Sequence, residues 1–215
     1  IYVLYLLMGS SVSDPPPEYQ DPYEYEEAGS LKKTFLTSTG VVNLLLTIVL
    51  FVGVVRLIPI DVEFVADVIG SISGNSVLPV IVLVFGGFSV IAFGTVILHE
   101  NVHKAVMEYF GYSVKINYGV PISYALIEEQ IIKRNHKLVS LISPLVAISS
   151  VSLSASYVIP NQLLTVLFTG IFVVNTVSTS GDIQGLVTLL RRPSGTVIWH
   201  THENGMPRSF VYEPE

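Results

Sequence analysis

Long apolar runs dominate the hydrophobic pattern of this chain. A bilayer core of about 30 Å requires about 20 apolar residues in a helix that rises 1.5 Å per residue. Stretches of that length predict spans at Phe35–Ile58, Val77–Leu98, Leu138–Val158 and Leu163–Leu190. The last stretch contains the polar or small residues Asn175, Ser178, Ser180, Gly181 and Asp182, which predict a break in the helix. The pattern therefore predicts an all-α polytopic membrane protein with about four transmembrane helices.

The segment Ser113–Lys133, between the second and third spans, has a different pattern. Apolar and polar residues alternate from Val114 to Tyr118, and Gly119 and Pro121 then interrupt the alternation. Alternation with a period of two, followed by turn residues, is typical of a β-hairpin. We therefore predict a short hairpin beside the inner end of the second span. Its exposed edge would suit an extended peptide that binds by strand addition.

Composition supports a membrane protein. Half of the 215 residues are hydrophobic, the mean hydropathy is +0.61, and only 13% of the residues are charged. A soluble domain has charged residues at about a quarter of its positions. The net charge of −6 provides no basic surface, so nucleic-acid binding is disfavoured. The absence of cysteine excludes disulfides, thiolate catalysis and cysteine-ligated metals.

The eleven lysines and arginines predict the orientation of the spans, because positive charge is retained on the cytoplasmic side. Nearly all of them precede the first span, separate the second from the third, or follow the fourth: Lys32, Lys33, Lys104, Lys115, Lys133, Arg134, Lys137, Arg191, Arg192 and Arg208. Only Arg56 lies near an outer end. We therefore expect both termini to face the cytoplasm.

The chain is expected to have three parts. Residues 1–30 are rich in proline and acidic residues, which predicts a disordered cytoplasmic tail. Residues 31–192 form the transmembrane domain, embedded in the lipid bilayer, and residues 193–215 form a second cytoplasmic tail. The apolar Ile1–Leu7 are too short to span a bilayer and lack a positive flank, so they do not predict a signal peptide, and Met8 is an alternative start.

The clearest candidate chemistry lies at the inner end of the second span, where His99, Glu100 and His103 form an H-E-x-x-H motif. On a helix, residues four apart share a face, so both imidazoles can bind one Zn²⁺ while Glu100 acts as a general base. So short a motif also arises by chance. Ionisable residues near membrane depth are costly and usually functional, however, which favours a metal site over coincidence.

A catalytic zinc site needs a third protein ligand, and Asp182 is the best candidate. Asp182 lies within the fourth predicted span, where an unpaired carboxylate costs about 3 kcal/mol. Metal ligation would remove that penalty. The alternative is a structural role, in which Asp182 caps a broken helix or bonds to Ser178 and Ser180.

The remaining histidines are weaker candidates. His136 lies among basic residues and is expected to be solvated. His200, His202 and Glu203 form an H-x-H-E pattern after the last span. A solvated tail is favoured there over a second metal site.

These motifs carry a family resemblance. The H-E-x-x-H motif followed by Gly111, the R-x-x-K-L-x-S-L-x-S-P-L run from Arg134 to Leu145, and Asn175 followed by Gly181 and Asp182 resemble the DUF3267 family of membrane zincin peptidases. More distantly, they resemble site-2 proteases. In that class, an aspartate in an N-x-x-P…D-G element completes the zinc site, which corresponds here to Asp182. This chain lacks the proline after Asn175 and has Ile183 in place of glycine.

The resemblance, which covers Leu31 to Arg192, implies a zinc-dependent metallopeptidase embedded in the membrane. It would hydrolyse membrane-associated polypeptides near the cytoplasmic face, with Glu100 as the general base and Asn175 as a donor to the oxyanion. The alternative is a catalytically inactive zinc-binding scaffold with a closed four-ligand site. A metal transporter would need ionisable residues through several spans, and the first and third spans have almost none. The oligomeric state stays open.

Overall fold

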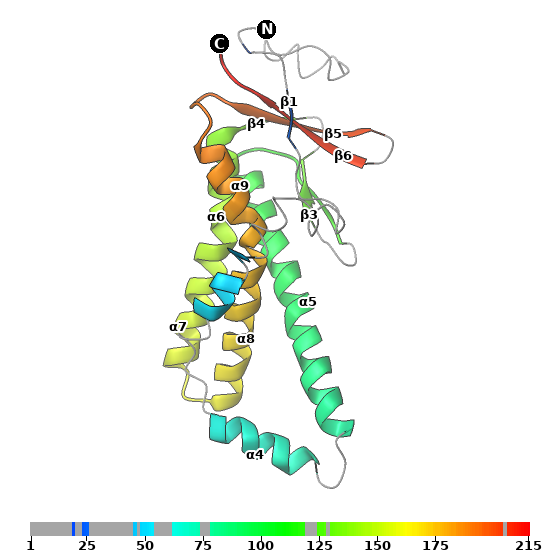
Figure 1. Ribbon diagram of the computed structural model, residues 1–215, viewed down its shortest axis with the longest axis vertical. Coiled ribbons are helices and arrows are strands. Elements are labelled where there is room, and N and C mark those ends of the chain that lie inside the picture. The colour runs from blue at the N-terminus through cyan, green and yellow to red at the C-terminus, as the bar shows by residue number, and fades with distance from the viewer. Residues whose placement is uncertain are drawn as a thin grey trace.

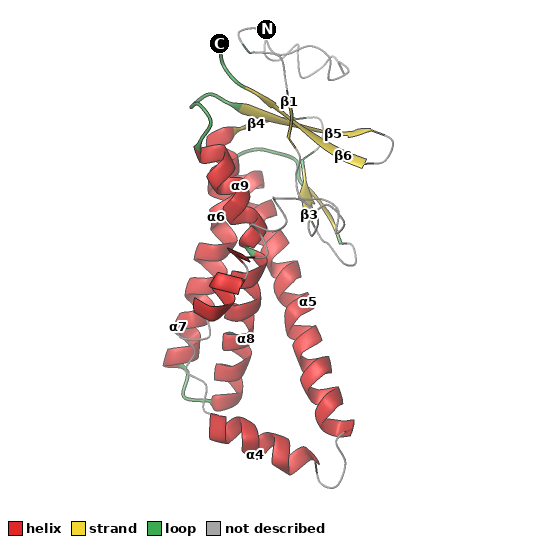
Figure 2. Cartoon of the chain, in the orientation of Figure 1, coloured by secondary structure: helices red, strands yellow, loops and turns green. Residues whose placement is uncertain are grey.

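The computed structural model describes residues 19, 23–25, 45–46, 48–53, 62–73, 78–118, 124–127, 130–203 and 206–215. Within these residues, long helices form a bundle and short strands gather at one end of it (Figures 1 and 2). The helices are α4 (Val62–Ser73), α5 (Leu78–Tyr109), α6 (Arg134–Pro144), η1 (Leu145–Ser149, a π-helix), α7 (Ser150–Val158), α8 (Gln162–Ser178) and α9 (Ser180–Leu190). The strands are β1 (Tyr23–Tyr25), β2 (Lys115–Asn117), β3 (Tyr124–Leu126), β4 (Ile131–Lys133), β5 (Val197–Glu203) and β6 (Met206–Tyr212).

Two helices of the described chain are long and apolar enough to cross a membrane. They are Val84–Tyr109, in α5, and Arg134–Val158, which joins α6, η1 and α7. The pair α8 and α9 would form a third span, bent by 41° at Thr179. This bend confirms the predicted break in the last apolar stretch. The predicted span Phe35–Ile58 lies largely outside the described residues, so a fourth span stays a prediction.

The distribution of side chains fits a protein surrounded by lipid. Large apolar side chains on α5 are exposed, including Phe85 at 69% and Val90 at 73%. The interior of the bundle is instead rich in small polar residues, such as Ser149, Ser152 and Thr176. Small polar residues allow helices to approach closely and form hydrogen bonds where no water is available. This inside-out pattern agrees with the membrane assignment.

The predicted hairpin is confirmed, since β2 and β3 pair antiparallel with Ile116 opposite Ala125. The helix before it ends where expected, because Gly111 adopts a φ of +89°, a left-handed conformation that glycine adopts without strain. The segment Ile131–Lys133 does not belong to this hairpin. It forms β4 of a separate four-stranded sheet.

The cytoplasmic location of residues 193–215 stays a prediction, but residues 197–203 and 206–212 form two strands of that sheet. Its antiparallel strands have the order β1-β6-β5-β4, and β5 and β6 pair along their length from Val197↔Tyr212 to Glu203↔Met206. Ile198 and Val211, 2% and 1% exposed, pack with the ends of α5 and α9 and with β4 in the main apolar core. The chain is therefore mostly helical but not all-α. Burial of apolar side chains of β5 and β6, such as Ile198 and Val211, gives this polar segment its order.

Four residues of the predicted N-terminal tail lie within the described part of the chain. Tyr23–Tyr25 form β1, which pairs with β6, and Tyr19 bridges to Pro214. Other residues before 45 lie outside the described chain.

Candidate metal centre

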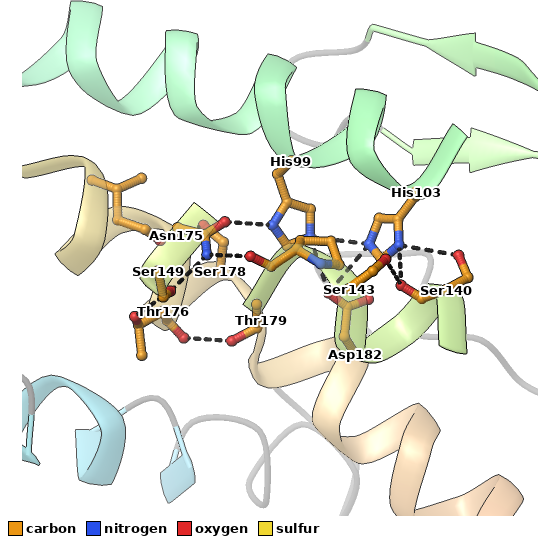
Figure 3. A network of polar contacts seen from close by, with 12 residues as sticks. His99, His103, Ser140, Ser143, Ser149, Asn175, Thr176, Ser178, Thr179 and Asp182 are labelled. Carbon is orange, nitrogen blue, oxygen red and sulfur yellow. Dashed lines mark hydrogen bonds and ion pairs between the residues drawn. The ribbon is translucent and has the colours of Figure 1, made fainter. Parts of the chain in front are cut away.

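The H-E-x-x-H motif of α5 faces residues of α6, α8 and α9 (Figure 3). Helix α5 presents His99 and His103 on one face, and both are buried, at 5% and 8% exposed. The Nε2 atoms of the two rings lie 3.1 Å apart. Asp182 Oδ2 lies 2.9 Å from His99 Nε2 and 3.3 Å from His103 Nε2. The structure therefore brings together the three ligands that the sequence predicted.

The break between α8 and α9 allows Asp182 to reach the histidines. Thr179 separates the two helices, and its hydroxyl donates to the Thr176 carbonyl at 2.7 Å. Helix α9 starts at Ser180 in a direction 41° from that of α8. Asp182 thus lies in the first turn of α9, where the helix dipole favours a negative charge.

Backbone and amide oxygens fix the orientation of the two rings. His99 Nδ1 donates to Asn175 Oδ1 at 3.0 Å, and His103 Nδ1 donates to the Ser140 carbonyl at 2.9 Å. Because a carbonyl oxygen can only accept, each Nδ1 carries the proton. In its neutral form, each ring then presents the lone pair of Nε2 to the other ring and to Asp182.

These three atoms fit a zinc ion. Two Nε2 atoms and a carboxylate oxygen face one another at 2.9 to 3.3 Å in a buried place, an arrangement that needs a metal ion or a proton on Nε2 among them. Two imidazoles and a carboxylate are a common ligand set of catalytic zinc. Tetrahedral ligands about 2.0–2.1 Å from Zn²⁺ would lie about 3.3 Å from one another. The donor set and its spacing therefore suit zinc.

Glu100 follows His99 on α5 and is partly buried. Strand β3, which contains Ala125, packs on α5, so the hairpin lies against the helix that carries Glu100. The general-base candidate thus lies next to the ligand cluster, on a helix that the hairpin contacts.

Asn175 has a different position from the one expected of an oxyanion donor. It is fully buried, and its Nδ2 donates to the Pro144 carbonyl at 3.0 Å and to Ser149 Oγ at 2.8 Å. Both amide protons are thus engaged within the chain, and Oδ1 accepts from His99. The structure places Asn175 behind His99, a candidate metal ligand, where it orients the ring.

The other candidate histidines lie apart from this cluster. His136 is not simply solvated, because its ring stacks on Phe110 with centroids 4.1 Å apart and bonds to the Tyr112 hydroxyl at 3.0 Å. His200 is 4% exposed and bonds to Ser209 Oγ at 2.7 Å across β5 and β6, which corrects its assignment to a solvated tail. Among the described residues, the only group of three or more metal-binding side chains is His99, His103 and Asp182.

The sequence did not identify the residues that hold the side chains of His103 and Asn175 in place. Ser140, Pro144 and Ser149 supply the oxygens that hold His103 and Asn175. The signal available in the sequence was Pro144, a proline inside an apolar stretch long enough to span the bilayer. A proline there leaves a backbone carbonyl without its amide donor.

Comparison with known proteins agrees with this site. Searches of curated proteins and of solved structures gave no match. The predicted likeness to site-2 proteases thus stays a prediction. The model of the DUF3267 family, described as "Putative zincin peptidase", matches residues 92–197, a segment that contains every residue of the site described above. Residues 92–197 of the chain are therefore similar to the DUF3267 family.

Proposed function

We propose that this protein is a zinc-dependent metallopeptidase of the membrane, which hydrolyses membrane-associated polypeptides near the cytoplasmic face. The convergence of His99, His103 and Asp182 on one point, with Glu100 beside them, carries the proposal. The family match supports zinc-dependent peptide hydrolysis. The apolar exterior of the helices supports a site within a membrane protein.

The chain's own residues account for binding and proton transfer. His99 and His103, through Nε2, and Asp182, through its carboxylate, would hold the ion. Zn²⁺, when bound, lowers the pKa of water towards neutrality and polarises a carbonyl oxygen. Glu100 takes the proton of the water that attacks the peptide carbonyl carbon. It passes that proton to the amide nitrogen as the C–O bond forms and the C–N bond breaks.

The hairpin gives a place for the substrate backbone. Strand β3 pairs with β2 and packs on α5, the helix that carries Glu100. An extended peptide that adds to β3 would pass close to Glu100 and to the ligands. A helical substrate must unwind to bind in this way, so glycine or polar residues near the cleaved bond would favour cleavage.

The orientation of the protein in the bilayer is part of the proposal. The strands gather at the end of the bundle where α5 and α9 end and α6 begins (Figure 1). Lysines and arginines near these ends, such as Lys104, Lys137 and Arg191, favour a cytoplasmic location. The site lies within α5 about ten residues, or about 15 Å, from this end.

The test compares Glu100→Gln with Glu108→Gln. Glu108 lies two turns further along α5, is 48% exposed and pairs only weakly with Lys104 at 3.5 Å, so it is a matched control. The full chain is reconstituted in vesicles with a designed single-span peptide that has a Gly-Ser pair near its cytoplasmic end. We expect wild type and Glu108→Gln to cleave it, and Glu100→Gln to bind zinc without cleaving.

Two results would contradict the proposal. Cleavage by Glu100→Gln at the wild-type rate would remove the general-base role. Tightly bound zinc in the wild type, without cleavage of this peptide or of a set with varied Gly-Ser positions, would favour the inactive scaffold. A scaffold should also have a closed coordination sphere, without a position for exchangeable water.

A further inference from the structure

Pro144 interrupts the long helix that faces the metal centre. A proline has no backbone N–H, and its ring crowds the carbonyl of the residue four positions earlier, which is Ser140 here. The Ser140 carbonyl accepts instead from His103 Nδ1 at 2.9 Å and from Ser143 Oγ at 2.7 Å. Two side-chain donors thus occupy an acceptor that a backbone amide would occupy in a regular helix.

The turn after Pro144 is also irregular. Residues Leu145–Ser149 form a π-helix, in which hydrogen bonds span five residues in place of four. On this wider turn, the Pro144 carbonyl and Ser149 Oγ accept the two Nδ2 protons of Asn175. The amide is thereby fixed with Oδ1 towards His99 Nδ1.

We propose that the irregularity centred on Pro144 is a positioning device for both histidine ligands. The carbonyl four residues before the proline fixes His103, and the π turn after it fixes His99 through Asn175. Both Nε2 atoms are thereby aimed at Asp182. Pro144 is less than 2% exposed and acts only through these partners, so it is a positioning residue. The inference rests on the zinc site of the proposed function.

Pro144→Ala tests the first half of the device. Alanine restores an N–H that competes with His103 for the Ser140 carbonyl, so the ring loses its fixed tautomer. We expect the affinity of the full-length, detergent-purified protein for zinc to fall about 10–100-fold, as measured by competition with a chromophoric chelator. The visible absorption of the Co²⁺-substituted protein should also change, because it reports the ligand geometry.

A main-chain ester analogue of alanine at position 144 separates the missing donor from the proline ring. This analogue has neither the ring nor an N–H, and it is introduced by nonsense suppression. If the absent donor is what matters, the ester keeps the zinc affinity and the Co²⁺ spectrum of the wild type. An ester variant as impaired as Pro144→Ala would show that the ring's shape is responsible and would overturn the role assigned to the Ser140 carbonyl.

Ser149→Ala and Ser152→Ala test the second half. Both serines are buried, at 6% and 2% exposed, but Ser149 holds Asn175 whereas Ser152 bonds to carbonyls of its own helix. We expect weaker zinc binding in Ser149→Ala alone. This pair decides the proposal if Pro144→Ala does not fold.

The outcomes separate this inference from the proposed function. Wild-type zinc affinity and unchanged Co²⁺ spectra in both Pro144→Ala and Ser149→Ala would overturn the positioning device and leave the proposed function intact. A wild-type protein that binds no zinc would overturn both.

Discussion

Replacing Asn175 by alanine separates two roles for this residue. The side chain is fully buried and makes three hydrogen bonds, at 3.0 Å to His99, 3.0 Å to Pro144 and 2.8 Å to Ser149. At about 0.5–1.5 kcal/mol for each of the three bonds, their loss should destabilise the bundle by about 1.5–4.5 kcal/mol. The loss of an orienting partner behind a ligand should also weaken zinc binding about 10–100-fold, or about 1.4–2.7 kcal/mol.

The assay measures zinc affinity and turnover of the same preparation, with helix content followed by circular dichroism. An oxyanion donor would show the opposite pattern, with unchanged zinc affinity and a kcat that falls about 100–1,000-fold. Asn161→Ala is the control, because Asn161 lies at the start of the same helix and accepts from the Leu164 amide at 3.1 Å. That variant should lose about 1 kcal/mol of stability and no zinc affinity. Wild-type zinc affinity in Asn175→Ala would refute the positioning role.

Three further substitutions have defined outcomes. His103→Ala should lose bound zinc, measured by metal analysis of the purified protein, and retention of one equivalent would contradict the ligand set. Asp182→Asn keeps the shape but removes the charge that faces two lone pairs, so zinc should again be lost, with the folded state confirmed by circular dichroism. Gly111→Ala should cost about 1 kcal/mol in chemical denaturation, because its φ is +89° and no atom lies within 4 Å of the added Cβ; an unchanged midpoint would show that the helix end relaxes freely.

The three candidate metal ligands were predictable because the constraints on them come from helix spacing or from the free-energy cost of a buried charge. His99 and His103 share a helix face through their spacing alone. Asp182 was found because an unpaired carboxylate in an apolar span is expensive. The helix end at Gly111 and the break at Thr179, between α8 and α9, follow from residue types that disfavour a continuous helix. None of these predictions required knowledge of how one helix or strand packs on another.

The sheet was not predictable by the same reasoning. Strands β5 and β6 contain polar residues such as His200 and Ser209, and Pro207 lies within β6. Their order depends on pairing with β1 and β4 and on packing of Ile198 and Val211 against helix ends. Such long-range burial overrides local composition. The same limit applies to Asn175, whose three partners come from two other helical segments.

The irregular places in these helices coincide with the metal centre. Pro144, the π turn after it and the break at Thr179 all adjoin residues that hold His99, His103 or Asp182. In a bilayer, a backbone group without a partner costs several kcal/mol, so an irregular turn persists only where other groups satisfy it. Here the donors are His103 and Asn175. The fold and the site therefore depend on each other: the histidine and the amide satisfy the irregular backbone, and that backbone fixes the rings that would bind the metal.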